Sequence, residues 1–380
     1  MELALYHPGD GYYSGPDVFG ASGDYFTSPA AHPVFGVLLT LQMHRMWEVM
    51  GRPRPFVVVE MGAGNGRLAE DLLSAAATML PAFAESLRYV ALDRYPALGG
   101  PSGPHRVLAE GVPLAGVAGC FVSNELVDSF PVHRFQIDRG EVREVYVTVD
   151  DNEDLSERLG KPSTPRLAER LSATEESLPG GFRGEVNLNV APWMEEVSAA
   201  LERGFVVTID YGNEAAEFYA ATRSRGTLQT HYRHTYGSSP YQRIGRQDIT
   251  SHVDFTHMAE EGGAVGLQPL ALLTQAQYLT GLGFQSMLRR IRSMGLGQRE
   301  RDANVMAMLE LVKPEGLGGF RVLIQEKGTG LEDVRRLAPA GEQIEALCPP
   351  LLGADHMPLL EGRYPHLTWQ PDRPLPPKEA

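Results

Sequence analysis

The stretch Phe56-Val57-Val58-Val59-Glu60-Met61-Gly62-Ala63-Gly64-Asn65-Gly66-Arg67 joins a short apolar run to a glycine-rich turn. The apolar run, Phe56–Val59, is continuous and mostly β-branched, which is typical of a strand buried on both faces of a parallel sheet. Beyond the turn, apolar residues recur at the spacing of one helix face, at Leu68, Leu72, Ala76 and Leu80. A strand, a glycine turn and a helix in this order predict an open α/β sheet whose ligand lies on the turn.

The glycine turn distinguishes between classes of nucleotide ligand. Its spacing is G-x-G-x-G, and Arg67 occupies the position where a dinucleotide-binding fold needs a small residue, which counts against NAD and FAD. The lysine of a phosphate-binding P-loop is missing too, which excludes the nucleoside triphosphatases. A tight turn that serves only packing is the alternative, because glycine is used there as well.

Two acidic residues favour a cationic cofactor that carries a ribose. Glu60 ends the first strand, where a carboxylate is unfavourable beside a pyrophosphate and favourable beside an ammonium or a sulfonium. Asp93 ends the next predicted strand, 89–93, where it can accept hydrogen bonds from both ribose hydroxyls. Glu110 is a candidate for the adenine side, with a surface position as the alternative. We therefore predict an S-adenosylmethionine site at Glu60, Gly62, Gly64, Gly66 and Asp93.

The alternation of strands and helices continues along the chain. We predict a helix that ends near Gly51, a helix from Trp193 to Arg203, and further strands at 120–123, 205–210 and 320–324. These elements predict one core, 52–135 and 191–330, in which residues 232–300 supply substrate-side loops and helices. Around this core we expect an N-terminal helical cap segment, 1–51, an insertion, 136–190, that forms a small sheet or lid, and a proline-rich tail, 331–380, that wraps the surface.

Composition argues against several classes of function and indicates a location. The net charge of -14 argues against a broad nucleic-acid-binding surface. The two cysteines, Cys120 and Cys348, are too few for a disulfide framework or a cysteine-based zinc site. Because the first residues lack a basic leader and no stretch approaches 18 apolar residues, we expect no signal peptide and no membrane span, and we expect the protein in the cytoplasm.

Six motifs in order give the chain a resemblance to a known family. They are Gly11-Tyr12-Tyr13, Gly23-Asp24-Tyr25-Phe26-Thr27-Ser28-Pro29, the Glu60 glycine turn, Asn124-Glu125-Leu126-Val127-Asp128-Ser129-Phe130-Pro131-Val132-His133, Ile209-Asp210-Tyr211-Gly212 and Asp248-Ile249-Thr250-Ser251-His252-Val253-Asp254-Phe255. From about Gly11 to Lys327 the chain resembles the mitochondrial complex I assembly methyltransferases and their bacterial relatives. The resemblance implies a Rossmann-like class I methyltransferase fold, S-adenosylmethionine as cofactor and an arginine side chain of a protein as acceptor. It adds Thr27 and Asn124 to the cofactor-binding residues.

The chain departs from the family pattern in several places, one of which is the stretch Asn187-Leu188-Asn189-Val190-Ala191-Pro192, where the family has a Glu-Ile/Val-Ser-Pro sequence and this chain lacks the carboxylate. The family usually has a proline and an arginine within the glycine turn, where this chain has Ala63 and Asn65, and a glutamate after the Thr-Ser-Pro motif, where it has Ala30. These departures predict a retained cofactor pocket and an altered acceptor pocket.

We predict the catalytic residues Glu125, Asp128, Tyr211 and His252. Glu125 and Asp128 can hold a guanidinium by paired, charge-assisted hydrogen bonds, and one of them can take a proton from it. A hydroxyl acceptor needs a base instead, and His252 or His133 suits that role near neutral pH. Capping of a helix after the fourth strand is the structural alternative for Asn124, Glu125 and Asp128. No metal is expected, because Asp254 in the His252–His257 segment fits a helix N-cap better than a metal ligand.

Three functions stay open at this point. The first is methyl transfer to a protein side chain, with arginine implied by the resemblance. The second is O-, N- or C-methylation of a small molecule, favoured by the altered acceptor motifs. The third is a non-catalytic assembly factor that binds the cofactor. We expect no nucleic-acid or membrane partner, and a homodimer is left open.

Overall fold

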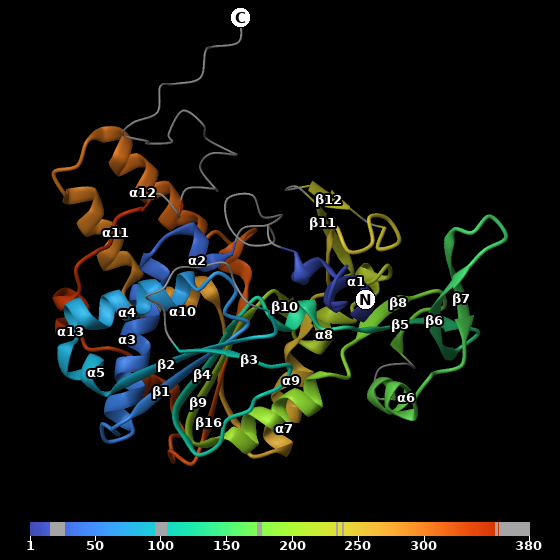
Figure 1. Cartoon of the computed structure of the whole chain (residues 1–380), viewed down its shortest axis with the longest axis horizontal. Coiled ribbons are helices and arrows are strands. Elements are labelled where there is room, and N and C mark those ends of the chain that lie inside the picture. The colour runs from blue at the N-terminus through green and yellow to red at the C-terminus, as the bar shows by residue number, and fades with distance from the viewer. Residues whose placement is uncertain are drawn as a thin grey trace, which may run out of the picture.

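The computed structural model describes residues 1–15, 27–95, 105–172, 177–232, 235–237, 239–353 and 356. Its centre is a seven-stranded sheet in the order β15-β16-β9-β4-β1-β2-β3 (Figure 1). The strands are β1 (Phe56–Met61), β2 (Leu87–Asp93), β3 (His105–Leu108), β4 (Val117–Asn124), β9 (Leu201–Asp210), β15 (Gln268–Thr274) and β16 (Arg321–Lys327). Strands β3, β2, β1, β4 and β9 are parallel, and β16 runs antiparallel to both of its neighbours. The predicted open α/β sheet is confirmed.

Both faces of the sheet are covered by helices, and each face has its own apolar core. One core holds Phe56 and Val58 with α3 (Val34–Val49), α4 (Arg67–Met79), α5 (Pro81–Ser86), α10 (Gln275–Gly281), α11 (Phe284–Ser293) and α12 (Gln298–Glu310). The other core holds Val59 and Met61 with α7 (Val190–Ala200) and α9 (Phe255–Ala264). Since successive residues of a strand point to opposite faces, a strand between two helical layers must be apolar at nearly every position, which explains the run that starts at Phe56.

The predicted N-terminal segment, 1–51, has two structural roles. Helix α3 is almost fully buried and packs on α4, so it belongs to the helical layer of the core. The residues before it form α1 (Glu2–Tyr6), a 3-10 turn (Tyr12–Ser14) and α2 (Ser28–Ala31), which lie near the carboxyl ends of the strands (Figure 1).

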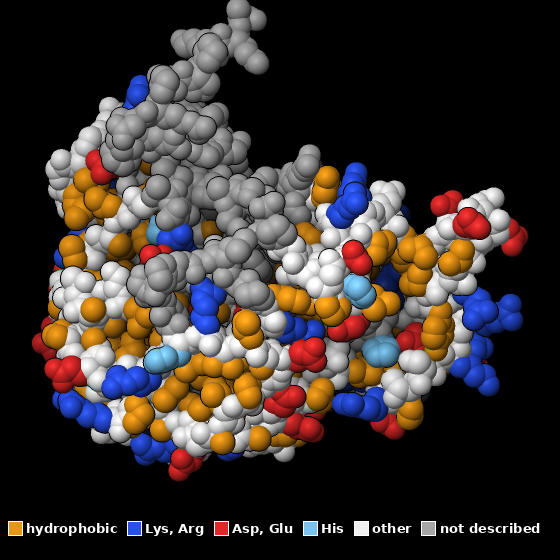
Figure 2. Space-filling model, in the orientation of Figure 1, with side chains coloured by type: hydrophobic (Ala, Val, Ile, Leu, Met, Phe, Trp, Pro, Cys, Tyr) orange, Lys and Arg blue, Asp and Glu red, His pale blue; other side chains and the backbone are white. Residues whose placement is uncertain are grey.

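The segment predicted as an insertion forms a second, antiparallel sheet in the order β7-β6-β5-β8. Its strands are β5 (His133–Asp138), β6 (Glu141–Val149), β7 (Leu155–Gly160) and β8 (Arg183–Val186), and α6 (Pro165–Leu171) packs on one face of it. The β6–β7 hairpin projects from the molecule, with acidic side chains at its tip (Figure 2). The acidic turn 150–154 is therefore the outer end of this hairpin.

Short strands connect the second sheet to the central one. Strands β11 (Gln229–Tyr232), β12 (Thr235–Gly237) and β13 (Asp248–Thr250) form a three-stranded sheet, and β10 (Gly212–Asn213) pairs with β14 (Val253–Asp254). Helix α8 (Ala215–Phe218) lies between β10 and β11 in the sequence. These elements place the segment around Asp248 close to the end of β9.

Two sequence-based boundaries differ from the structure. The helix predicted to run to Arg203 ends at Ala200, because Leu201 and Arg203 already pair with Val117 and Ala118 of β4. The tail from 331 was expected only to wrap the surface, but Leu331, Leu337 and Leu347 are buried in the core that contains α3. Its turn Val334–Leu337 and its helix α13 (Gly341–Ala346) carry these side chains, and the residues beyond 356 lie outside the described part of the chain.

The rings of Trp47, Phe56 and Phe83 form an aromatic cluster in the core that contains α3. The Phe83 ring of α5 is fully buried and lies 5.7 Å from the Phe56 ring and 5.6 Å from the Trp47 ring. We expect Phe83→Ala to lower the free energy of unfolding by about 3–5 kcal/mol in urea denaturation, because it leaves a cavity. Leu309→Ala, at a 40% exposed site on α12, is the control and should change it by no more than about 0.5 kcal/mol. Equal losses in both variants would contradict this description of the core.

Candidate active site

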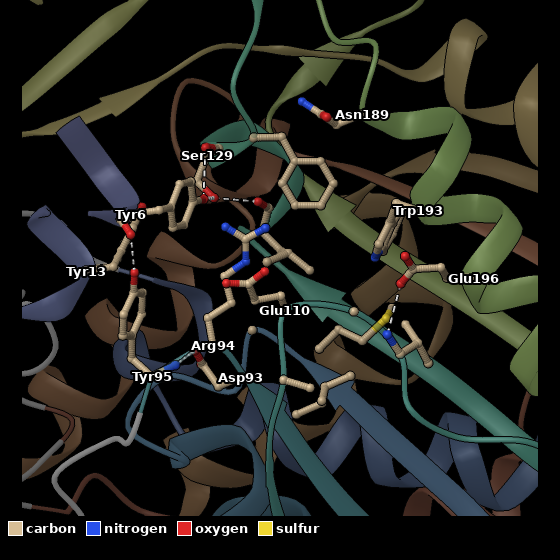
Figure 3. Close-up of a pocket in the computed structure, with 18 of the residues that line it drawn as sticks. Tyr6, Tyr13, Asp93, Arg94, Tyr95, Glu110, Ser129, Asn189, Trp193 and Glu196 are labelled. Atoms are coloured by element: carbon tan, nitrogen blue, oxygen red, sulfur yellow. Dashed lines mark hydrogen bonds between the residues drawn. The ribbon is translucent and has the colours of Figure 1, made fainter. Parts of the chain in front are cut away.

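A cavity of about 270 Å³ opens at the carboxyl ends of β1, β2 and β4 (Figure 3). Ligands of open α/β sheets bind at this edge. The cavity is lined by residues that follow these strands, by α7 and by the N-terminal segment. The lining includes Glu2, Tyr6, Tyr13, Gly62, Asp93, Arg94, Glu110, Glu125, Ser129, Phe130, Trp193 and Glu196.

The glycine turn lies at the floor of the cavity. Gly62, Gly64 and Gly66 have φ angles of 71°, 49° and 80°, a left-handed conformation that glycine adopts without strain. Gly62 lines the cavity, and a Cβ atom there would lie 2.8 Å from Cδ1 of Leu126. Gly64 and Gly66 turn the chain into α4 and do not line the cavity. Of the three predicted glycines, Gly62 is therefore the one placed for close approach to a ligand.

Asp93 lies in the cavity wall, as expected of a ribose-binding carboxylate. Its Oδ2 accepts the N–H of Gly64 at 2.8 Å and its Oδ1 accepts the N–H of Tyr95 at 3.2 Å, which fixes the carboxylate. Burial raises the pKa of Asp93, and these N–H groups oppose the shift. Each oxygen has a further lone pair for a ribose hydroxyl. Glu110 follows β3 and lines the same cavity, and its place on the adenine side stays a prediction.

Glu60 differs from its predicted role. Its carboxylate is buried and accepts a hydrogen bond from the hydroxyl of Tyr89 at 2.8 Å, and Glu60 is not among the residues that line the cavity. Burial raises the pKa of Glu60 to about 8. The structure thus places Glu60 beneath the turn, hydrogen-bonded to Tyr89 and not in the lining of the cavity.

Glu125 is the acidic residue at the inner wall of the cavity. It has a φ angle of 53°, which is unusual and strained for a residue with a side chain. Its Oε1 accepts the N–H of Ser28 at 3.1 Å and an amide proton of Asn124 at 2.8 Å. Burial, with Asp128 nearby, raises the pKa of Glu125 to about 8. The first residues of α2 and the end of β4 therefore meet at this carboxylate.

Two predicted cofactor residues lie near Glu125 and not on the cavity wall. Thr27 directly precedes α2, and Asn124 ends β4, but neither is among the lining residues. Their observed neighbours connect them to Glu125. The Tyr25 and Phe26 part of the same motif lies outside the described residues.

Asp128 and Tyr211 form a buried pair behind the cavity wall. The Tyr211 hydroxyl donates to Oδ2 of Asp128, and the other oxygen of Asp128 is buried without a hydrogen-bond partner. Burial raises the pKa of Asp128 to about 6. The two residues predicted to be catalytic are thus in contact, and neither lines the cavity.

His252 lies apart from Glu125. Its ring packs edge-on against the Tyr211 ring at 5.3 Å, and it lines a smaller pocket with Glu185 and His257. Burial lowers the pKa of His252 to about 4, so its imidazole is neutral at physiological pH. His133, the second candidate base, binds Glu144 at 2.7 Å in the second sheet. The structure brings neither histidine to the cavity.

The helix-capping alternative for Asn124, Glu125 and Asp128 is wrong. Only a three-residue 3-10 turn, Val127–Ser129, follows β4, and no side chain caps it from its N-cap position. The carboxylate that binds the N–H groups of this loop is Asp210, from β9. Sequence spacing could not reveal this contact because it joins residues about 80 positions apart.

One wall of the cavity joins the N-terminal segment to the residues that follow β2, and the sequence did not single out Tyr6, Arg94 or Tyr95 for it. The Tyr6 hydroxyl donates to the backbone oxygen of Ser129 at 3.0 Å, and the Tyr95 hydroxyl donates to the Tyr6 backbone oxygen at 2.6 Å (Figure 3). The Tyr13 ring stacks on Tyr6 at 5.4 Å, and the Arg94 guanidinium lies 4.6 Å from the centre of the Tyr6 ring. The aromatic motif near Tyr12 and Tyr13 was the only sequence signal for this wall.

Asp248 is another carboxylate of the site that the sequence did not single out. It is buried at the start of β13, and its Oδ1 accepts the Tyr13 hydroxyl at 2.9 Å. Through Tyr13 it joins the N-terminal segment to the motif 248–255.

The metal reading of the His252–His257 segment finds no support in the geometry. Asp254 accepts the N–H of His257 at 3.1 Å and caps α9, as predicted. Within the described part of the chain, no three histidine, cysteine, aspartate or glutamate side chains converge on a common point.

A sequence profile described as "Putative S-adenosyl-L-methionine-dependent methyltransferase" matches residues 38–102 and 104–272. Curated relatives carry the name protein arginine methyltransferase NDUFAF7, mitochondrial. The Drosophila melanogaster homolog is 27% identical to this chain over 298 residues. The match covers 70% of this chain and 66% of the homolog, which is about two thirds of that relative's length. The Homo sapiens protein is 25% identical over 355 residues, covering 84% and 76%.

A solved structure extends the similarity to a bound ligand. The crystal structure of a protein from Burkholderia thailandensis bound to S-adenosyl-homocysteine has a TM-score of 0.76 and 27% identity, covering 90% of this chain and 89% of that one. A native crystal structure from the same organism has a TM-score of 0.74 and 26% identity over the same shares. S-adenosylmethionine is therefore the cofactor, and the cavity with Gly62, Asp93 and Glu110 offers a floor for close approach and a carboxylate pair suited to its ribose and adenine sides.

We expect Asp93→Ala to weaken the binding of S-adenosyl-homocysteine by roughly 1–3 kcal/mol, because ribose hydroxyls lose their acceptor. Isothermal titration calorimetry gives the change directly, and thermal melting reports whether the variant folds. Asp138→Ala on β5 is the control, since Asp138 does not line the cavity. An unchanged dissociation constant in Asp93→Ala would place the ribose elsewhere.

Glu60→Gln separates a direct role of Glu60 in binding from an indirect one. Because the pKa of Glu60 is raised to about 8 in the folded chain, the unfolded chain loses this proton at a lower pH, and stability falls as the pH rises from about 5 to 8. Glu60→Gln removes this titration, so its melting temperature should fall less over that range. Binding of S-adenosyl-homocysteine should stay within about threefold of the wild type, or less than about 1 kcal/mol.

The control for Glu60→Gln is Glu195→Gln at an exposed site of α7. It should reproduce the wild-type dependence on pH. If the melting temperature of Glu60→Gln depended on pH as strongly as that of the wild type, Glu60 would be ionised in the folded chain. Loss of S-adenosyl-homocysteine binding in Glu60→Gln would instead support the direct contact between Glu60 and the ligand that the sequence predicts.

Proposed function

The chain belongs to this family of S-adenosyl-L-methionine-dependent methyltransferases, and we propose that it methylates an arginine side chain of a protein. The single observation that carries the choice of acceptor is the Glu125 carboxylate in the inner wall of the cofactor cavity. The names of the curated relatives support the same acceptor.

The charge around the cavity supports a cationic acceptor. Five carboxylates line it and only one guanidinium, Arg94, does so among the described residues; the carboxylates are Glu2, Asp93, Glu110, Glu125 and Glu196. Asp128 and Asp248 add negative charge behind Glu125 and raise its pKa. Buried carboxylates are unfavourable without a partner, and a guanidinium would supply one.

The aromatic wall supports a planar cation. The guanidinium of Arg94 already lies over the Tyr6 ring in this cavity, so the wall accepts a group of this shape and charge. A guanidinium stacks on an aromatic face and pairs with a carboxylate at the same time.

The reaction requires alignment and removal of one proton. The bound cofactor supplies a methyl group activated by its sulfonium. Glu125 can orient the guanidinium by charge-assisted hydrogen bonds and accept the N–H proton that the methylated nitrogen loses. Its raised pKa would fall when a cation arrives next to it, so the carboxylate becomes ionised once the acceptor is in place. Asn124 and the N–H of Ser28 hold the carboxylate in position.

We expect Glu125→Gln to reduce methyl transfer by about 100-fold or more while it binds S-adenosyl-homocysteine within about threefold of the wild type. The assay incubates the enzyme and methyl-tritiated cofactor with an extract of cells that lack the gene, and counts methylarginine after acid hydrolysis of the protein fraction. Glu195→Gln is the matched control, with an exposed carboxylate away from the cavity.

Other outcomes of this assay favour the two alternatives. Tritium recovered in the small-molecule fraction would identify a small-molecule methyltransferase, for which the apolar side chains Phe130 and Trp193 in the cavity wall are suited. No transfer by the wild type, with full function of Glu125→Gln in cells, would support a cofactor-binding assembly factor.

The proposal includes a protein partner and no nucleic acid, supported by the net charge of -14. In the described part of the chain, no helix is long and apolar enough to cross a bilayer. The cytoplasm and a homodimer stay predictions, and the curated relatives are named mitochondrial.

A further inference from the structure

Asp210 ends β9 and is fully buried behind the cavity wall. Its Oδ2 accepts three backbone N–H groups, from Leu126 at 3.2 Å, Val127 at 2.9 Å and Asp128 at 3.3 Å. Its Oδ1 accepts the N–H of Tyr211 at 2.9 Å. A single carboxylate thus binds every N–H group of the loop that directly follows Glu125.

This loop needs such an acceptor because of the conformation of Glu125. The left-handed φ angle of 53° turns the chain away from the sheet immediately after Asn124, the last residue of β4. The N–H of Glu125 still binds the backbone oxygen of Ile209 at 2.9 Å. The next three N–H groups have left the ladder between β4 and β9, and buried N–H groups without a partner are costly.

We propose that Asp210 is a positioning residue for methyl transfer, which fixes the Glu125 carboxylate in the cavity wall by holding the loop 126–128. The proposal rests on the proposed function of Glu125. Asp210 does not line the cavity, so it acts through the backbone of the loop and not by contact with a ligand.

Burial and the neighbouring carboxylates Asp128 and Glu125 raise the pKa of Asp210, while the N–H groups of the loop lower it. These N–H groups donate hydrogen bonds to the Asp210 carboxylate, so they stabilise its ionised form and oppose the effect of burial.

The cofactor half of the site is held by hydrogen bonds that do not involve Asp210. Gly62 and Asp93 are fixed by the β1 turn and the end of β2, through the bonds of Gly64 to Asp93 and of Gly62 to Leu92. A change at Asp210 should therefore separate the turnover number from the binding of cofactor. A general loss of folding would reduce both.

The test compares Asp210→Asn with Thr208→Val. Asparagine keeps the shape of Asp210 but brings its side-chain amide N–H donors next to the backbone N–H donors of the loop. Thr208 is the control because it is a buried residue of the same strand and its hydroxyl has no hydrogen-bond partner. In the tritium assay for methylarginine, we expect kcat of Asp210→Asn to fall about 30-fold or more. KM for S-adenosylmethionine and the affinity for S-adenosyl-homocysteine should stay within about threefold, and Thr208→Val should match the wild type.

Asp210→Glu provides the second variant. It keeps the charge and moves the carboxylate outward by one methylene, so a positioning role predicts a fall of kcat here too. If Asp210→Asn does not fold, Asp210→Glu decides the question. A kcat within about threefold of the wild type in a folded variant, or equal losses in turnover and cofactor binding, would overturn the proposal.

Amide hydrogen exchange keeps this proposal distinct from the proposed function. If the wild type labels no arginine, the acceptor assignment fails, and exchange at residues 126–128 still reports on Asp210. Faster exchange confined to this loop in Asp210→Asn supports the positioning role, and wild-type rates there contradict it.

Discussion

The parallel register of β1 with β2 and β4 determines where the active site forms. Met61 of β1 lies opposite Leu92 of β2 and Ser123 of β4, so the three strands end at the same edge of the sheet. Gly62, Asp93 and Glu125 lie at these ends, and each of them lines the cavity. Three segments far apart in the sequence can meet here because hydrogen bonds between the strands fix their relative positions to one residue.

The site gathers more carboxyl groups than these buried surroundings allow to be ionised together. Burial raises the pKa of Glu60 and Glu125 to about 8, and Asp210 adds a carboxylate with no access to solvent. A cofactor with a sulfonium and an ammonium, and a guanidinium acceptor, would each reduce the repulsion between these groups. Backbone N–H groups hold the carboxylates meanwhile, at Gly64 for Asp93 and at Val127 for Asp210. The same N–H groups that stabilise these carboxylates also fix their positions.

Sequence reasoning succeeded where the signal is local. The β-branched run at Phe56 and the i, i+4 spacing of the helix after the glycine turn predicted β1 and α4, and Asp254 predicted the cap of α9. It failed where long-range pairing decides. The helix expected to reach Arg203 ends at Ala200 because β4 recruits the residues after it into β9. The N–H groups after β4 are bound by Asp210 from another strand and not by the predicted caps, a contact that no local spacing encodes.

The sequence by itself determined the fold class and the cofactor, because strand, glycine turn and helix follow one another within a few residues and form by local backbone preference. It also predicted Glu125, Asp128, Tyr211 and His252 as catalytic residues. Only the tertiary structure decided their orientation. Glu60 points at Tyr89 and not at the cavity, His252 lies behind Tyr211, and Tyr6 and Tyr13 form a wall. The physical reason is that a side chain's direction depends on which neighbours pack against it, and those neighbours come from strands and turns far away in the chain.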